Sequence, residues 1–83
     1  MRVDIFRREE RDNNFSYLIV PEGRLIPAEA ANIDWEMDTR GVDLNIDLES
    51  LDEYSIIQPA KQIQSKGYAI STSASIPGVD GHI

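Results

Sequence analysis

The chain contains no cysteine, and this absence excludes several kinds of chemistry. Neither disulfides nor thiolate metal sites can form, and no thiol nucleophile is available. No apolar run approaches the roughly 20 residues that a membrane-spanning helix needs, and the first residues lack the apolar segment of a secretory signal. We therefore expect a cytoplasmic protein with no membrane partner. Its stability has to come from packing or self-association.

Catalytic side chains are equally scarce. The one histidine, His82, lies next to the last residue of the sequence, where we expect nothing to orient it as a base. None of the serines belongs to a recognisable nucleophile-base pair, and the sequence has neither a phosphate loop nor a dinucleotide-binding glycine pattern. We therefore predict a protein that is not an enzyme and that holds no cofactor.

Basic residues are outnumbered by acidic ones, and the net charge is −7 over 83 residues, a length that allows a single domain. The excess of acidic residues is concentrated in residues 29–53, which contain nine acidic residues and one basic residue, Arg40. Overall acidity repels phosphate backbones, so we do not expect a nucleic-acid partner.

Residues 34–49 alternate between apolar and polar side chains with a period of two, and the phase changes once, at Gly41. Such alternation is typical of β-structure. Two geometries accommodate the change of phase: a hairpin loop at Arg40 and Gly41, or one bent strand with a bulge at Gly41. Both predict an apolar face and an acidic face. The apolar set comprises Trp35, Met37, Thr39, Val42, Leu44, Ile46 and Leu48, and the polar set comprises Asp34, Glu36, Asp38, Asp43, Asn45 and Asp47.

The hairpin geometry would create a candidate cation site. It places Asp38 opposite Asp43 and Asp34 opposite Asp47, and like charges facing each other across strands destabilise the pair. A divalent metal ion or the lysine and arginine side chains of a partner would neutralise them. With a bulge instead, the same acids are offset and water screens them.

Residues 2–8 and 15–20 are predicted to form an antiparallel hairpin, because β-branched and aromatic residues flank a polar turn. Pairing Ile5 with Tyr17 places Val3 on one face of this hairpin. This pairing leaves apolar side chains on the other face of the hairpin as well. A single short helix, predicted below, would cover only one of the two faces. Candidates for an interaction surface on that second face are Phe6, Leu18 and Val20.

A main helix is predicted over residues 59–66, because Pro59 suits its first position, Lys66 its last turn and Gly67 its left-handed end. Shorter helical turns are expected near 27–32 and 51–56, a closing strand at 68–71 and a disordered tail at 72–83. We therefore predict one α+β domain over residues 1–71, an antiparallel sheet of four to five strands with the helix packed on one face. Its predicted core comprises Val3, Ile5, Tyr17, Ile19, Trp35, Met37, Val42, Leu44, Ile46, Ile63 and Ile70.

Several short segments carry a resemblance to a known family. They are residues 1–5, 15–18, 20–23, 34–36 and 67–70, with the sequences MRVDI, FSYL, VPEG, DWE and GYAI. In these the chain resembles a family of short bacterial proteins classed as a domain of unknown function, over residues 1 to about 71. The resemblance implies no activity, cofactor or partner, and it carries over no catalytic residues.

Taken together, these observations favour a small acidic non-catalytic protein-interaction module. Its partner would be another protein or a second copy of the chain, which would bind through the hairpin or through an exposed sheet edge. Two alternatives remain open. One is a binder of divalent metal or a small ligand on the acidic face, and the other is an acidic decoy that occupies a basic nucleic-acid-binding protein.

Overall fold

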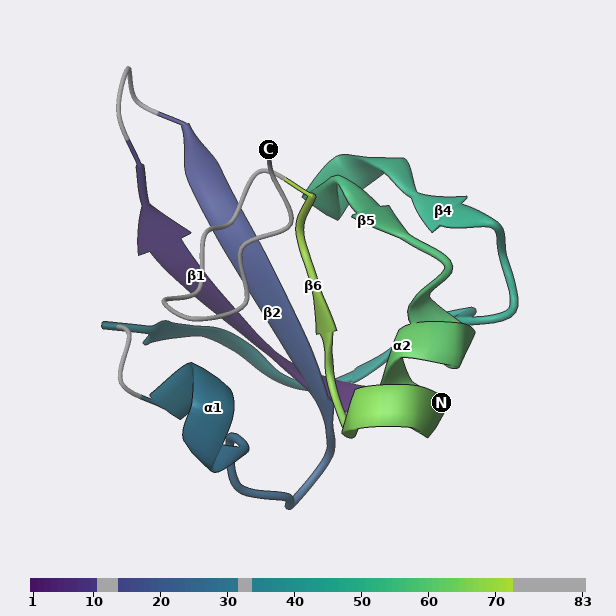
Figure 1. Cartoon of the computed structure of the whole chain (residues 1–83), viewed down its shortest axis with the longest axis horizontal. Helices are drawn as coiled ribbons and strands as arrows, with labels where there is room; N and C mark the ends of the chain where they lie inside the picture. Colours follow the sequence, from purple (N-terminus) through teal and green to yellow (C-terminus); the bar gives the residue numbers. More distant parts are fainter. Residues whose placement is uncertain (11–13, 32–33, 73–83) are drawn as a thin grey trace.

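The computed structural model describes residues 1–10, 14–31 and 34–72. Its main feature is a four-stranded antiparallel sheet in the order β3-β1-β2-β6 (Figure 1). The strands are β1 (Arg2–Glu9), β2 (Phe15–Pro21), β3 (Glu36–Asp43) and β6 (Ala69–Ile70). The predicted α+β class and antiparallel sheet are thus confirmed. Residues 73–83, which hold most of the predicted tail, lie outside the described part.

The remaining elements lie on the two sides of this sheet (Figure 1). Helix α1 (Ala28–Ala31) is on one side, and the other side holds a second small sheet of β4 (Ser50–Leu51) and β5 (Ile56–Ile57), the short helix η2 (Asp52–Tyr54) and helix α2 (Pro59–Lys66). The bounds of α2 match the predicted 59–66, and Gly67 ends the helix with φ 89°. The second sheet was not predicted. None of the helices in the described residues has the length and apolar character needed to cross a bilayer.

Strands β1 and β2 form the predicted hairpin in a register that differs from the expected one. Ile5 pairs with Ile19, and Tyr17 pairs with Arg7. The expected pairing of Ile5 with Tyr17 was therefore wrong by two residues. A shift of two residues keeps every side chain on its own face, so the predicted division of apolar residues between the faces still holds.

Strand β3 passes through Gly41 without turning back, so the bulge geometry is confirmed and the hairpin at Arg40 and Gly41 was wrong. The register of β3 against β1 shifts twice, between Val3 and Ile5 and between Ile5 and Phe6. Gly41 has φ 67°, a left-handed conformation that glycine adopts without a steric penalty. After Asp43 the chain leaves the sheet.

Apolar side chains form two core clusters, one on each face of the main sheet. The first core cluster consists of Val3, Ile5, Ile19, Leu51, Ile56 and Ala69, with Tyr17, Val42, Leu44, Tyr54 and Ile63 packed against it. The second core cluster consists of Leu18, Val20, Ala30 and Tyr68, with Phe6, Ile26, Trp35 and Ile70 packed against it. Both faces of the sheet are therefore covered.

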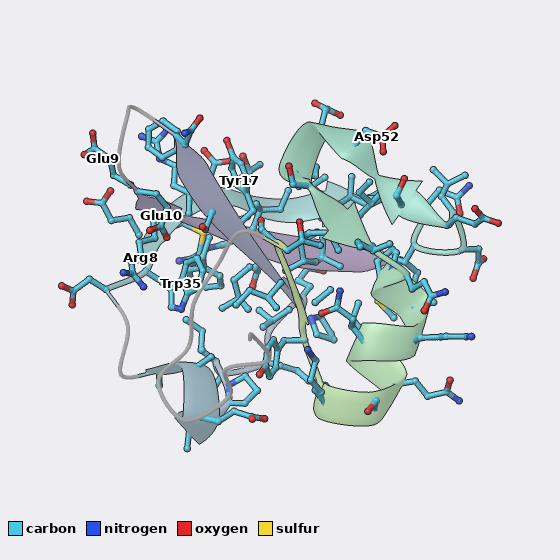
Figure 2. The ribbon with its side chains drawn as sticks, turned by 45° about the horizontal axis from the view of Figure 1, so that its top comes forward. Arg8, Glu9, Glu10, Tyr17, Trp35 and Asp52 are labelled. Atoms are coloured by element: carbon cyan, nitrogen blue, oxygen red, sulfur yellow. The ribbon has the colours of Figure 1, made fainter. Side chains whose placement is uncertain are left out.

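This arrangement corrects the expectation of a single apolar face along residues 34–49. Trp35 packs against the second core cluster, whereas Val42 and Leu44 pack against the first. Met37 is 40% exposed and belongs to neither. Figure 2 shows Trp35 and Tyr17 extending to different sides of the sheet. The expectation was wrong because the strand contains two register shifts and both faces of the sheet bury apolar groups, so period-two alternation did not identify one interior side.

Candidate functional site

The four aspartates proposed as a cation site do not face each other in pairs, because the chain does not form a hairpin at Gly41. Asp38 and Asp43 lie in the same strand, five residues apart, which corresponds to roughly 15 Å. Asp34 precedes this strand and Asp47 lies in the turn that follows it. The Asp43 carboxylate accepts a hydrogen bond from the N-terminal ammonium of Met1 at 3.2 Å. In the described part of the chain, no three histidine, aspartate or glutamate side chains are grouped as metal ligands.

The three apolar residues proposed as an interaction surface lie inside the protein. Leu18 and Val20 are fully buried, and Phe6 packs partly buried against the same second core cluster. The side chains that cover them come from helix α1 and from the segment after α2, including Ala30 and Tyr68. A partner that bound here would have to displace these covering residues.

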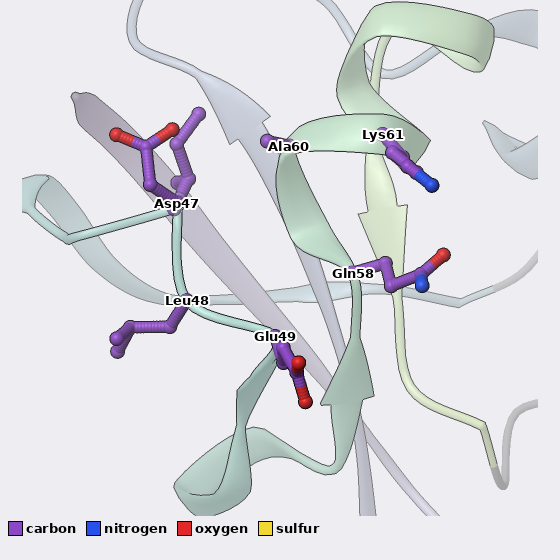
Figure 3. Close-up of a pocket in the computed structure, with 7 residues that line it drawn as sticks. Asp47, Leu48, Glu49, Gln58, Ala60 and Lys61 are labelled. Carbon is purple, nitrogen blue, oxygen red and sulfur yellow. The ribbon is translucent and has the colours of Figure 1, made fainter.

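An open pocket of about 330 Å³ lies between the turn after β3 and the first turn of α2 (Figure 3). Its charged groups have both signs, with the carboxylates of Asp47 and Glu49 on one side and the Lys61 ammonium on the other. Two backbone hydrogen bonds join the two segments that line it. Gln58 N–H donates to the backbone carbonyl oxygen of Glu49 at 2.6 Å, and Ala60 N–H donates to that of Ile46 at 3.2 Å. Gln58 itself has φ 47°, an uncommon conformation for a residue with a side chain.

The main sheet has two edge strands, β6 and β3, and the edge at β6 is closed by a side chain. The Gln62 amide of α2 accepts a hydrogen bond from the Ile70 N–H at 3.0 Å and donates to the Ile70 carbonyl oxygen at 3.4 Å. The same amide also donates to the Ile57 carbonyl oxygen at 2.7 Å. Gln62 therefore occupies the backbone groups that a further strand would pair with.

The edge at β3 is different. Within the described residues, β3 pairs with β1 on one side, and no strand pairs with its outer side. All five residues of its first part, 36–40, are exposed. A strand edge of this kind offers a row of backbone donors and acceptors to another chain.

The side chains along this edge include both acidic and basic residues. Asp38 and Arg40 flank Thr39, and none of the ion pairs formed by described residues involves either of them. Among the described residues, Asp38 accepts one hydrogen bond, a long one of 3.4 Å from the Thr39 hydroxyl. We define the outer edge of β3 at residues 36–40 as the β3 edge. Sequence reasoning considered Asp38 as a metal ligand and did not single out residues 36–40 as an exposed strand edge. The acid and the base that flank Thr39 were a visible signal, but they do not show which edge of a sheet a strand occupies.

Comparisons with known proteins identify a family without adding an activity. Residues 1–76 match the family described as a family of unknown function (DUF6139). No curated protein and no solved structure matches the chain.

Proposed function

Because the chain belongs to DUF6139, a family whose function is unknown, we propose a function from its own surfaces. We infer a non-catalytic protein-interaction module that binds a partner protein by adding a strand at the β3 edge. We place this module in the cytoplasm, in keeping with a chain that contains no cysteine.

The observation that carries this proposal is the contrast between the two edges of the main sheet. A side chain from α2 satisfies the backbone of β6, while the first five residues of β3 are exposed and have no neighbour on the outer side within the described residues. Strand addition derives its affinity from main-chain hydrogen bonds, and it derives its selectivity from alternate side chains. The β3 edge supplies both, with Met37 as an exposed apolar contact.

Charged residues at an edge discourage indiscriminate pairing. At the β3 edge, Glu36, Asp38 and Arg40 act in this way, because a wholly apolar strand would leave their charges unpaired in the interface. The same side chains favour a partner strand that places a base against Asp38 and an acid against Arg40. The charges thus make this edge selective.

The test compares two substitutions of exposed apolar residues by lysine. Met37→Lys puts a charge into the β3 edge, and Ile57→Lys puts the same charge on β5, where the side chain is 52% exposed. Each purified chain is immobilised and exposed to soluble extract of the source cells, and the retained proteins are quantified. Wild type and Ile57→Lys should retain the same protein, and Met37→Lys should lose most of it.

Hydrogen exchange then locates the contact. Addition of the retained protein to the wild-type chain should slow the exchange of backbone amides in residues 36–40 and leave those of α2 unchanged. The proposal is wrong if retention is equal in all three chains, or if the amides of the β3 edge gain no protection.

A further inference from the structure

We propose that the partner of the β3 edge is a second copy of this chain, bound in an antiparallel register centred on Thr39. This inference rests on the proposed function and names its partner. It follows from the order of side chains along one short stretch, residues 37–41, with the sequence MDTRG. Most soluble oligomers are two-fold symmetric, and a two-fold axis requires that the contact surface complement itself.

A two-fold axis through Thr39 makes this stretch self-complementary. Thr39 of one copy faces Thr39 of the other, and threonine pairs are favourable across antiparallel strands. Asp38 faces Arg40 of the second copy, and by symmetry this contact occurs twice. Met37 faces Gly41, which has no side chain of its own and beside which the exposed side chains of Arg2 and Glu22 lie.

The neighbouring registers lack this complementarity. An axis through Asp38 places two aspartates directly opposite each other, and an axis through Arg40 does the same for two arginines. Like charges directly opposite each other across strands are destabilising. The register centred on Thr39 therefore has the most favourable charges among the three.

The size of the interface predicts how tightly the copies bind. Five paired residues from each chain form a contact smaller than the roughly 1,200 to 2,000 Å² of stable complexes. The register of β3 against β1 also shifts on both sides of Thr39, between Met37 and Thr39 and between Thr39 and Val42, and these shifts limit regular pairing. We therefore expect a reversible dimer with a dissociation constant in the micromolar to millimolar range.

Sedimentation equilibrium between about 10 µM and about 1 mM tests the dimer, and charge reversals test its register. Asp38→Arg creates two arginine pairs across the interface, and Arg40→Asp creates two aspartate pairs. Each change should raise the dissociation constant at least about tenfold. Glu36→Arg alters the net charge by the same amount as Asp38→Arg, but Glu36 faces Val42 in this register, so its dissociation constant should stay near that of the wild type.

A mixture of the two weakened variants gives the sharpest result. When Asp38→Arg is mixed with Arg40→Asp in equal amounts, both arginines of one chain face aspartates of the other. The mixture should associate at least as well as the wild type, although neither variant alone does. The double variant Asp38→Arg/Arg40→Asp should also associate, because reversing both charges restores every opposite pair.

Crosslinking provides a second measurement that does not require tight binding. The chain has no cysteine, so Thr39→Cys introduces a single one. Facing residues across antiparallel strands have Cα atoms about 4.5 to 5.5 Å apart, within the range that disulfides span. Mild oxidation should link Thr39→Cys into dimers rapidly and Glu36→Cys only slowly.

The proposal is overturned by a strict monomer at about 1 mM that Thr39→Cys does not crosslink, or by a dimer that both charge reversals leave intact. A dimer that survives them would use another surface. The proposed interaction function fails separately. If the chain is a monomer and a retained protein still protects the amides of the β3 edge, the second copy is the wrong partner and the module is correct.

Discussion

Asp4 Oδ1 accepts a hydrogen bond of 2.9 Å from the backbone N–H of Gly41, so a carboxylate of β1 holds the bulge of β3. The second oxygen, Oδ2, accepts from the Gly23 N–H at 3.3 Å, in the turn that follows β2. The Asp4 side chain is almost fully buried, with 7% exposure. One buried carboxylate therefore joins two glycines that are distant in sequence and that both have positive φ.

Removal of this carboxylate should destabilise the protein. Asp4→Ala leaves two backbone donors without their acceptor, and we expect the free energy of unfolding to fall by about 2 to 3 kcal/mol. Asp4→Asn retains one acceptor oxygen and should lose about half as much. Urea denaturation followed by Trp35 fluorescence measures both. Asp38→Ala, at an exposed acid, is the control and should stay within about 0.5 kcal/mol of the wild type; equal losses in Asp4→Ala and this control would contradict the role of Asp4.

The two glycines bound by Asp4 make a matched pair of substitutions. A Cβ at Gly23 would meet nothing within 4 Å, so Gly23→Ala carries only the left-handed backbone penalty of about 1 to 2 kcal/mol. A Cβ at Gly41 would lie 2.6 Å from Glu22 Oε2 and 2.8 Å from Arg2 Nη2. Gly41→Ala should therefore also disrupt the exposed Arg2 to Glu22 ion pair, which adds a smaller loss to the backbone penalty.

A second background separates these two effects. In Glu22→Ala the obstructing carboxylate is absent, and the exposed Arg2 side chain loses the partner that holds it near Gly41. In this background Gly41→Ala should lower the free energy of unfolding by about as much as Gly23→Ala does in the wild type. Urea denaturation of the wild type, the three single variants and the double variant Glu22→Ala/Gly41→Ala provides the comparison. If Gly41→Ala is as stable as the wild type in either background, its backbone does not keep the left-handed conformation in solution.

The same residues show how far the sequence alone predicts this fold. The bounds of α2 were predictable because Pro59, Lys66 and Gly67 are local signals that act within one turn of the helix. The contacts of Asp4 were not, since its donors lie at positions 23 and 41 and nothing near Asp4 distinguishes it from a solvated strand residue. Contacts between distant segments are set by tertiary packing, which a local pattern does not encode.

At the β3 edge, too, the local features were predictable from sequence and the tertiary contacts were not. Alternation correctly indicated β-structure around Gly41, and the bulge was one of the two geometries it allowed. It did not reveal that Trp35 and Val42 belong to different faces, because alternation assigns faces only where the register is continuous. The hydrogen bonds by which Gln62 closes the β6 edge could not be predicted from sequence either. A glutamine on an amphipathic helix gives no sign of whether its amide faces solvent or binds the backbone of a neighbouring strand.

Gln62 provides a test of that closed edge. Gln62→Leu removes the acceptor of the Ile70 N–H and the donor to the Ile57 carbonyl oxygen, so we expect a loss of about 1 to 3 kcal/mol in the free energy of unfolding. The Ile70 amide should also exchange faster with solvent. Gln64→Leu, an exposed position on the same helix, is the control and should change neither quantity. Unaltered exchange at Ile70 in Gln62→Leu would show that another group closes this edge.

The last prediction concerns alkaline pH and the Tyr68 hydroxyl. This side chain is fully buried, and among the described residues its oxygen has no partner in good hydrogen-bonding geometry. Burial raises the pKa of Tyr68, and the nearby Glu29 carboxylate adds to the increase through its negative charge and its attraction for the hydroxyl proton. A raised pKa means that the folded state disfavours the phenolate. Stability is therefore complete below the ordinary pKa of about 10 and decreases as the pH rises above it, because the unfolded chain ionises first.

Tyr68→Phe should reduce this alkaline loss of stability. At about pH 7 the variant should be as stable as the wild type or up to about 1 kcal/mol more stable, because a buried hydroxyl without a well-formed hydrogen bond is removed. Between about pH 9 and about pH 11.5 its free energy of unfolding should fall less steeply. Burial also raises the pKa of Tyr54, so Tyr54→Phe should reduce part of the slope and the double variant should reduce it further. Parallel stability curves for wild type and Tyr68→Phe over this range would mean that the hydroxyl is accessible to water in solution.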